Sequence, residues 1–326
     1  MAKLNMVKAL NLALRQEMDR DPDVLVIGED VGVDGGVFRV TEDLHRAFGS
    51  RRVIDSPLAE AAIVGTSVGM ALYGLKPVCE IQFSGFAFQC FHQFENHAAR
   101  YRMRSQGRFH IPLVVRMPYG GGVRALEHHS ESEEQFYAQI PGLKMVIPSG
   151  PRNARALLVS AIRDPDPVIF FEGKALYHAE REEVPEEPET LPIGRARIAR
   201  EGRDITLVSY GAMLRVVHEA AEVLARDDHV EAEVIDLLTI SPLDREALVG
   251  SVTKTGRAVI VHEAPRSFGA GAEIAASIMD GAFLSLEAPI RRVTAYDVPF
   301  VGFARERANV PDTARVVAAA RETLSF

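Results

Sequence analysis

Short apolar runs alternate with longer helix-type segments along most of this chain, and that alternation limits the possible folds more than any other feature. Helix-type segments are found at 59–73, 86–104 and 151–163. Between and beside them lie six runs rich in Val, Ile and Phe: 24–28, 52–56, 77–83, 112–118, 143–149 and 167–173. Apolar strands separated by helices are typical of a mostly parallel sheet that is covered on both faces. The sequence therefore predicts an α/β fold.

The pattern is interrupted by an acidic, proline-bearing stretch and then resumes. The stretch EREEVPEEPETLPIGR begins at Glu180 and has the composition of an exposed linker. Strand-type runs follow at 205–211, 230–237, 257–263 and 291–297, with helices expected near 212–226, near 270–281 and after Pro311. We therefore predict two parallel-sheet α/β domains, 1–180 and 199–326, joined by an acidic linker over 181–198.

Composition argues against several classes of protein. A length of 326 residues suits two domains, and 47% hydrophobic with 25% charged residues is ordinary for a globular protein. The net charge of −8 argues against binding to nucleic acid or to anionic membranes. Ala61–Leu75 lacks charges but is shorter than the ~20 residues of a membrane span. Cys79 and Cys90 lie in apolar sequence, so we expect buried free thiols and a reducing, cytoplasmic location.

One helix-type segment combines an acid near its start with many small residues. In SPLAEAAIVGTSVGMALYGL, residues 56–75, Ser56 and Pro57 are typical of a helix start. Two interpretations fit Glu60: a first-turn acid that the helix dipole stabilises, or a functional carboxylate beside an apolar wall. Gly65 and Gly69 lie four residues apart, which fits either tight internal packing or a subunit contact.

Polar residues follow several predicted strands at their carboxyl ends, where open α/β sheets bind ligands. Glu29 follows the first run, Glu60 lies soon after the second, and Gln82 lies near the end of the third. The fourth run leads through three glycines to the adjacent histidines His128 and His129. We expect Glu29, Glu60, Gln82 and a histidine to share one edge of the sheet. Because the two histidines are neighbours, their side chains should point in different directions.

Several common motifs are absent or incomplete. The chain has no GxxxxGK[ST] phosphate loop, no GxSxG nucleophile turn and no HExxH zinc helix. The stretch SFGAGAEI at 267–274 places Ile274 where the dinucleotide motif GxGxxG needs its third glycine.

Taken together, the motifs resemble one family. Along nearly the whole chain, and in order, the resemblance is carried by GEDVGVDGGVFRVT, SPLAEAAIVGTSVGMALYG, EIQFSGF, MPYGGGV, HHSES, PGLKMVIPS, AIRDPDPVIFFE, LYHAEREEVPEE, LPIGRA, EVIDLLTISPLD, SVTKTGRAVIVHEAP and SLEAPIRRV. These stretches resemble the β subunit of E1 in the 2-oxo acid dehydrogenase complexes, the thiamine-diphosphate-dependent decarboxylase of the pyruvate and branched-chain complexes. The resemblance implies a pyrimidine-binding domain followed by a transketolase C-terminal-type domain. It implies decarboxylation of a 2-oxo acid, with pyruvate expected, and transfer of the acyl unit to a lipoyl group on E2.

The resemblance also assigns roles to residues of this chain. Glu60 matches the acid that contacts N1′ of the cofactor's aminopyrimidine and activates the cofactor, and Glu29 matches an acid close to it. His129 matches the active-site histidine, where proton handling and hydrogen bonding to a phosphate or loop are both compatible. The other matches are Leu58, Ala59, Gln82 and Phe86 around the pyrimidine, and Phe83, Ser84, Gly85 and Phe86, with His129, towards the substrate.

A missing motif implies a partner. Thiamine enzymes hold the diphosphate through Mg²⁺ with a GDG motif, and no GDG occurs in this chain. The resemblance implies that an E1 α subunit supplies this half of the site in an α2β2 heterotetramer. It further implies contact with the E2 lipoyl acyltransferase, through its peripheral subunit-binding domain and its lipoyl domain. A K⁺ ion is also expected, although DPDP at 164–167 equally suits a plain turn; its ligands would be Leu113, Ala161, Ile162, Asp164 and Asp166.

Three other interpretations are compatible with the sequence. The chain could be the branched-chain or the acetoin version of the same subunit, because only the shape of the substrate pocket separates these. It could be a non-catalytic assembly protein with the same fold, although four polar site residues would then be retained without a role. A single-chain transketolase-like enzyme is opposed by the missing GDG and by the chain length.

Overall fold

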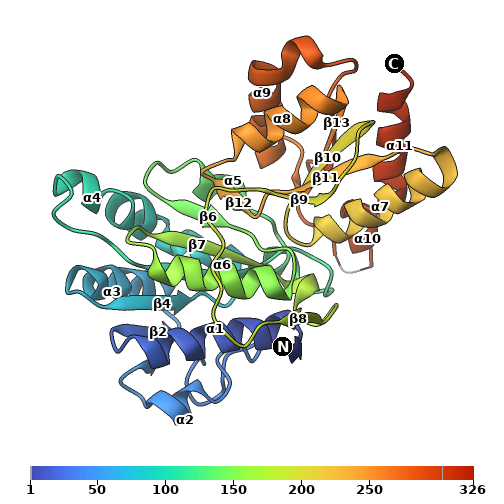
Figure 1. The fold of residues 1–326 in the computed structure, drawn as a ribbon. Helices are drawn as coiled ribbons and strands as arrows, with labels where there is room; N and C mark the ends of the chain where they lie inside the picture. The colour runs from blue at the N-terminus through green and yellow to red at the C-terminus, as the bar shows by residue number, and fades with distance from the viewer. Residues whose placement is uncertain (1, 303) are drawn as a thin grey trace.

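The computed structural model describes residues 2–302 and 304–326, which form two α/β domains (Figure 1). The first domain is built on seven strands: β2 (Val24–Gly28), β3 (Val53–Asp55), β4 (Lys76–Glu80), β5 (Val114–Tyr119), β6 (Lys144–Val146), β7 (Val168–Gly173) and β12 (Thr239–Ser241). Their order across the sheet is β12-β6-β7-β5-β4-β2-β3, and every neighbouring pair is parallel except β12 and β6. The predicted mostly parallel sheet is thus confirmed.

Both faces of this sheet are covered, because successive strand residues point to opposite sides. Val24 and Val26 of β2 belong to the core beneath α1 (Met6–Arg20) and α6 (Pro151–Arg163). Leu25 and Ile27 belong to a second core, beneath α3 (Glu60–Leu72). Strands buried on both sides explain why the apolar runs are continuous rather than alternating.

The helix predicted to start at Ser56 begins instead at Glu60. The Ser56 N–H donates to the Gly28 carbonyl, which extends the pairing of β2 with β3, and the Ser56 hydroxyl donates to the Pro57 carbonyl. Ser56 is therefore engaged in strand pairing and cannot cap the helix. The residue before the helix is Ala59, which has no side chain able to cap it.

The single helix expected over 86–104 is also wrong. This segment is a 3-10 helix, η1 (Ser84–Cys90), a π-helical stretch, η2 (Gln93–Ala98), and a short helix, α4 (Tyr101–Arg104). The apolar residues predicted a buried helical segment, but hydrophobic spacing alone does not distinguish these three kinds of turn. Cys79 and Cys90 are both buried free thiols, as expected.

The second domain has a five-stranded sheet with the order β14-β13-β10-β11-β9. Its strands are β9 (Arg197–Arg200), β10 (Ile205–Ser209), β11 (Ala232–Asp236), β13 (Ala258–Pro265) and β14 (Arg291–Ala295), all parallel to their neighbours except β9. Four helices cover it: α7 (Met213–Asp228) packs with α11 (Thr313–Leu324), and α8 (Arg245–Thr255) packs with α9 (Ala270–Ala282). The sequence did not predict α8, β9 or β12.

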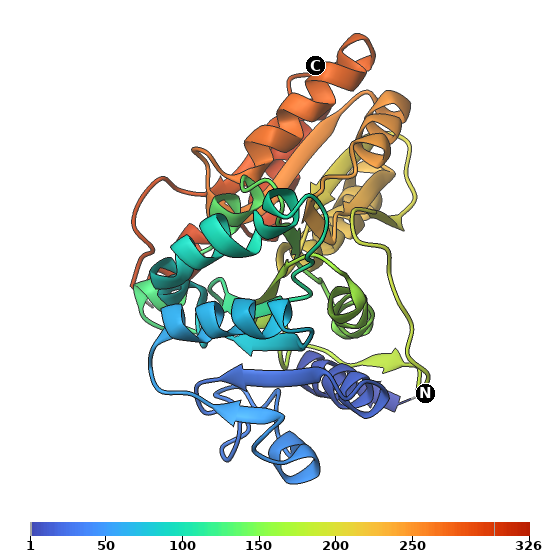
Figure 2. The ribbon, with the colours of Figure 1, turned by 90° about the vertical axis from the view of Figure 1, so that its left-hand side faces the viewer.

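The acidic stretch after Glu180 contains a short strand. Strand β8 (Glu182–Val184) pairs antiparallel with β1 (Ala2–Leu4). From β8 the chain runs along the side of the first domain to reach the second (Figure 2). The remaining short elements are α2 (Leu44–Phe48), η3 (Glu127–His129), α5 (Glu134–Ala138), η4 (Lys174–Leu176), η5 (Phe283–Ser285) and α10 (Glu306–Asn309). Across the described residues, no helix has both the length and the apolar character that a membrane crossing needs.

A buried ion network joins three adjacent strands at the middle of the first sheet. Arg116 on β5 is 1% exposed; its Nη1 donates to Glu80 on β4 at 2.5 Å. Its Nε and Nη2 donate to the two carboxylate oxygens of Glu172 on β7, at 2.7 and 2.8 Å. The Tyr177 hydroxyl adds a 2.6 Å bond to Glu172. One guanidinium thus pairs with two buried carboxylates, and burial raises the pKa of Glu80 although Arg116 opposes this.

We expect Arg116→Met to destabilise the protein by about 3–5 kcal/mol, because two buried carboxylates lose their counter-charge. Adding Glu80→Gln and Glu172→Gln should recover a large part of that loss. Urea unfolding measures both effects. The control is Arg245→Met, which removes an exposed pair with Glu273 and should cost at most about 1 kcal/mol. An equal loss for both arginines would show that the buried network has no special role.

Candidate active site

Two carboxylates meet where β2 ends and α3 begins. Glu29 directly follows β2, and Glu60 is the first residue of α3. The two side chains are buried, and neither carboxylate oxygen of Glu29 has a hydrogen-bond partner among the described residues. Burial, together with the Glu60 and Asp30 carboxylates, raises the pKa of Glu29 to about 7, which the nearby Ala59 N–H only partly opposes. A carboxyl group in this state can give or take a proton near neutral pH.

Gln82 joins the same edge of the sheet from β4. Its Nε2 donates to Asp30 Oδ2 at 2.8 Å, next to Glu29 in the chain. Asp30 has φ 57°, a left-handed conformation that turns the chain sharply after the strand. The structure therefore brings Glu29, Glu60 and Gln82 to one edge of the first sheet.

His129 lies against two phenylalanines that follow β4. The centroid of its ring is 4.4 Å from that of Phe83 and 5.2 Å from that of Phe86, with edge-to-face geometry in both pairs. Its Nδ1 is buried and has no hydrogen-bond partner among the residues described. Burial, with His128 and Lys174 nearby, lowers the pKa of His129 below its usual value. The ring is therefore neutral at pH 7 and can accept a proton.

The expectation that His128 and His129 point apart is wrong. Their rings are stacked, with centroids 4.9 Å apart and an interplanar angle of 28°. That expectation assumed an extended strand or a regular helix, whereas both residues lie in the short 3-10 turn η3. Phe86 also contacts the His128 ring, at 5.4 Å.

The other predicted contact residues lie on the two segments that carry Glu60 and Phe83. Gly85 allows the backbone of the histidine loop to come close, because a Cβ there would collide with the His128 carbonyl. Ser84 is buried at the start of η1, and Ala59 is partly buried just before Glu60. Leu58 is 81% exposed, so its side chain has no cover from this chain. If a second molecule completes the site, it can cover the exposed side chain of Leu58.

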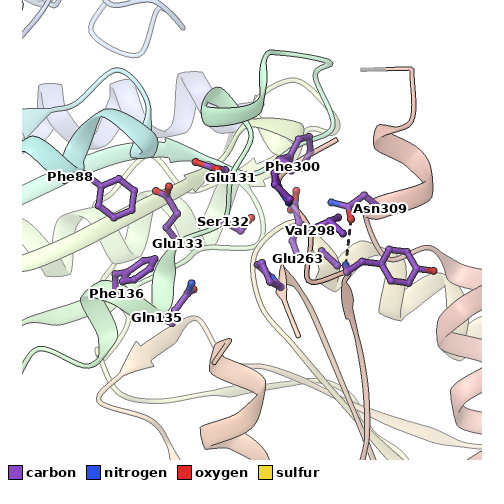
Figure 3. A pocket seen from close by; sticks show the side chains of 14 residues that line it. Phe88, Glu131, Ser132, Glu133, Gln135, Phe136, Glu263, Val298, Phe300 and Asn309 are labelled. Carbon is purple, nitrogen blue, oxygen red and sulfur yellow. Dashed lines mark hydrogen bonds between the residues drawn. The ribbon is translucent and has the colours of Figure 1, made fainter. Parts of the chain in front are cut away.

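A cavity of about 360 Å³ lies beside the histidine loop, between the two domains (Figure 3). Figure 3 shows Glu131, Ser132 and Glu133 of the first domain across from Glu263 and Phe300 of the second. A groove also lies beside Phe268 of the second domain. Neither the cavity nor this groove is lined by Glu29 or Glu60. Glu29 and Glu60 thus lie outside both spaces at the domain junction.

Sequence reasoning missed two buried charged groups near this cavity, Lys174 and Glu263. Lys174 directly follows β7, and Glu263 lies near the end of β13. Each therefore sits at the carboxyl end of a strand, which is the signal that identified Glu29 and Gln82. Lys174 lies outside the stretches that carry the family resemblance, and Glu263 lies inside one of them, SVTKTGRAVIVHEAP, but has no role assigned by it.

The five residues proposed to bind K⁺ lie at the opposite edge of the sheet, before β5 and β7. Lys144 Nζ is 2.7 Å from each carboxylate oxygen of Asp164 and 3.6 Å from Asp166. Arg102 pairs with Asp166 at 2.5 Å, and the Leu113 carbonyl accepts the Val168 N–H. Within residues 2–302 and 304–326, no group of three His, Cys, Asp or Glu side chains could hold a metal ion. Both aspartates are thus paired with basic side chains, and the K⁺ site stays a prediction.

The fold and the site together define a two-domain protein of the transketolase type. Residues 2–180 match the family model described as the transketolase pyrimidine-binding domain, and residues 194–316 match that of the transketolase C-terminal domain. A solved structure described as a split gene transketolase, an inactive β4 tetramer, aligns over 99% of both chains with a TM-score of 0.81. Its sequence identity is 22%, so this similarity concerns the fold alone.

Full-length relatives narrow the class further. The pyruvate dehydrogenase E1 component subunit beta of Staphylococcus epidermidis (strain ATCC 35984) is 50% identical over 326 residues, which cover 100% of both chains. The subunit of the same name from Staphylococcus aureus (strain Mu50) is 49% identical with the same coverage. The chain therefore belongs to the family of pyruvate dehydrogenase E1 component β subunits.

The raised pKa of Glu29 predicts a pH-dependent stability. Between about pH 4.5 and pH 7 the unfolded chain releases this proton while the folded chain keeps it, so wild-type stability falls as pH rises. Glu29→Gln removes the titration, so its stability relative to wild type should increase from about pH 5 to pH 8 and then level off. Urea unfolding of the ligand-free protein at several pH values measures this.

Glu273→Gln, an exposed carboxylate on α9, is the control and should change little across the same range. A constant difference between Glu29→Gln and wild type at all pH values would contradict the raised pKa.

Proposed function

We propose that this chain is the β subunit of a thiamine-diphosphate-dependent E1 that decarboxylates pyruvate and transfers the acetyl unit to the lipoyl group of E2. The observation that carries the proposal is the buried pair of Glu29 and Glu60 at the start of α3, beside Gln82, Phe83 and His129. The full-length relatives named pyruvate dehydrogenase E1 component subunit beta support the same function.

The residues present fit the pyrimidine half of thiamine diphosphate. Glu29 has unpartnered buried oxygens, and the His129 Nδ1 is likewise without a partner among the described residues, so polar groups at this edge are left for a ligand. Ala59, Gln82, Phe86 and the exposed Leu58 would hold the ring. Bound there, thiamine diphosphate supplies the electron sink that loss of carbon dioxide requires.

Glu60 would then act through a proton shared with N1′ of the pyrimidine. Glu60 is buried, and the carboxyl group of Glu29 next to it has a pKa raised to about 7 by burial and by the Glu60 and Asp30 carboxylates. Phe83 and Phe86 exclude water from the side on which the substrate would lie. The neutral His129 would take a proton at its free nitrogen during acyl transfer.

The finer assignments are proposals of the same kind. An E1 α subunit in an α2β2 assembly would hold Mg²⁺ and the diphosphate, since this chain has no GDG motif. The exposed face of α3 suits such a contact, because a Cβ on Gly69 would meet nothing within 4 Å in this chain. E2 would contact the second domain, and the buried free thiols Cys79 and Cys90 suit a cytoplasmic location.

A branched-chain or acetoin version of the subunit is the alternative closest to this proposal, and a non-catalytic assembly subunit is the more distant one. The names of the full-length relatives favour pyruvate. The retained and partly unpartnered polar groups of the site favour catalysis over assembly. Turnover of pyruvate, 2-oxoisovalerate and acetoin by the reconstituted complex would separate the substrate classes.

Glu60→Gln tests the central role. It preserves size and removes the group that shares a proton, so turnover of the assembled enzyme should fall by roughly 10²–10⁴ while folding and assembly persist. Exchange of the C2 proton of bound thiamine diphosphate for deuterium, measured without any 2-oxo acid, should slow by a similar factor. Exchange at the wild-type rate in a correctly assembled variant would remove Glu60 from the mechanism.

Calorimetry tests the shared site. The chain alone should bind thiamine diphosphate with Mg²⁺ only weakly, because it lacks the groups that hold the diphosphate, and added α subunit should restore binding. Micromolar or tighter binding by the chain alone would contradict a site divided between two chains.

A further inference from the structure

Three consecutive glycines follow β5, and none of them has room for a side chain. A Cβ on Gly120 would lie 2.9 Å from Glu263 Oε2, and a Cβ on Gly121 would lie 2.8 Å from Phe300 Cζ. At Gly122 a Cβ would lie 2.7 Å from the Cβ of Ala175. The φ angles of Gly120 and Gly122 are 79° and 90°, a region that favours glycine. Because these glycines have no side chains, other parts of the protein can come close to the backbone of the turn.

Two carboxylates of the second domain make that approach. The Gly121 N–H donates to Glu263 of β13, and the Gly122 N–H donates to Glu306, the first residue of α10. The two glutamates are 7% and 4% exposed. Buried carboxylates need donors to offset their lost hydration, and here the donors are backbone groups of the other domain. We call Glu263 and Glu306 the glutamate clamp.

A buried ammonium accompanies the clamp. Lys174 is 3% exposed, and its Nζ has no hydrogen-bond partner within the described part of the chain. Burial lowers its pKa, while the Glu263, Glu306 and Glu133 carboxylates act in the opposite direction and favour the charged form. Lys174 thus supplies positive charge to a group of carboxylates that would otherwise repel one another.

The clamped turn is one end of the loop that carries His129. The Gly120 N–H donates to the Glu131 carbonyl at 2.9 Å, which closes the loop over residues 120–131. His129 near the far end contacts the Phe83 ring, and Lys174 Nζ lies 5.8 Å from the centroid of the same ring. Holding the turn therefore also constrains where the His129 ring lies.

We propose that the glutamate clamp positions His129, so that the second domain sets the place of a catalytic histidine that belongs to the first. This inference rests on the function proposed above for His129. The clamp acts through the backbone of the glycine turn, and neither glutamate needs to touch the substrate or the cofactor. The cavity in Figure 3 borders Glu263 and Phe300, so on this side the domains touch through the clamp rather than through continuous packing.

Two roles of the glutamates lead to different results. If they only braced the domains together, their loss would lower thermal stability and leave the folded loop as ordered as before. If they position the loop, their loss would free residues 121–131 and reduce turnover in an enzyme that remains assembled. Hydrogen–deuterium exchange of that segment, read by mass spectrometry on the assembled enzyme, separates the two.

The first variant is Glu263→Leu combined with Glu306→Leu, which keeps side chains of similar size and removes both acceptors of the glycine N–H groups. We expect faster exchange over 121–131, a fall in kcat of about 10–100-fold, and a pyruvate KM within about twofold of wild type. The control is Glu273→Gln on α9, which should change none of these. Unchanged exchange in the double variant, or a loss of thermal stability alone, would overturn the proposal.

The second variant tests the same proposal in case the first variant does not fold. Gly121→Ala keeps both glutamates and pushes the turn away from Phe300, so it should show the same exchange and kcat changes. Adding Phe300→Ala should recover part of both. Gly250→Ala on α8, where a Cβ meets nothing within 4 Å, is the matched control. Wild-type exchange and turnover in Gly121→Ala would overturn the proposal.

His129→Ala separates this proposal from the one on which it rests. Full turnover in that variant would remove His129 from the mechanism and with it the catalytic part of the inference. The exchange of residues 121–131 in the clamp variants uses no substrate, so it still decides whether the glutamates hold the loop.

Discussion

The first domain depends on the charge of one guanidinium. Arg116 links Glu80 and Glu172 across three adjacent strands, and none of the three side chains has appreciable contact with solvent. A few residues after each of these positions the chain leaves the sheet: after β4 towards Gln82, after β5 towards the glycine turn, and after β7 towards Lys174. The network therefore fixes the points from which three segments of the site depart. Substitution of Arg116 by an apolar residue would leave the carboxylates on both neighbouring strands without a counter-charge.

The two domains are joined by non-covalent contacts as well as by the chain that links them. Strand β12 follows β11 of the second domain in the chain, yet it pairs with β6 at the edge of the first sheet. The hydrophobic cores on the two faces of the first sheet also include residues of the second domain, such as Val217 and Leu248. With the carboxylates at the glycine turn, these contacts make the second domain part of the support for the site.

The sequence predicted the layered fold well because buried parallel strands appear in a sequence as continuous apolar runs. Helix 151–163 was predicted with the bounds that it has, since Pro151 begins it and an amphipathic pattern continues to Arg163. Short edge strands such as β9 and β12 carry too few residues for such a pattern. The prediction of one helix over 86–104 was wrong for a different reason: the apolar residues there indicate burial but not the type of helical turn.

The same logic explains which parts of the site could be predicted. Glu29 and Gln82 come soon after strands, so topology alone carries them to one edge. The stacked histidines could not be foreseen, because the orientation of neighbouring side chains depends on the exact turn between them. Nor could the pairing of Lys144 with Asp164, which joins residues 20 apart in the chain.

The pairing of β1 with β8 brings the start and the end of the first domain to one place. Residues 2–4 lie beside residues 182–184, so strands β2 to β7 and their helices belong to a segment whose two ends are adjacent, whereas β12 joins the sheet from the second domain. A unit whose ends meet can be joined to different neighbours through short connections without rebuilding its core.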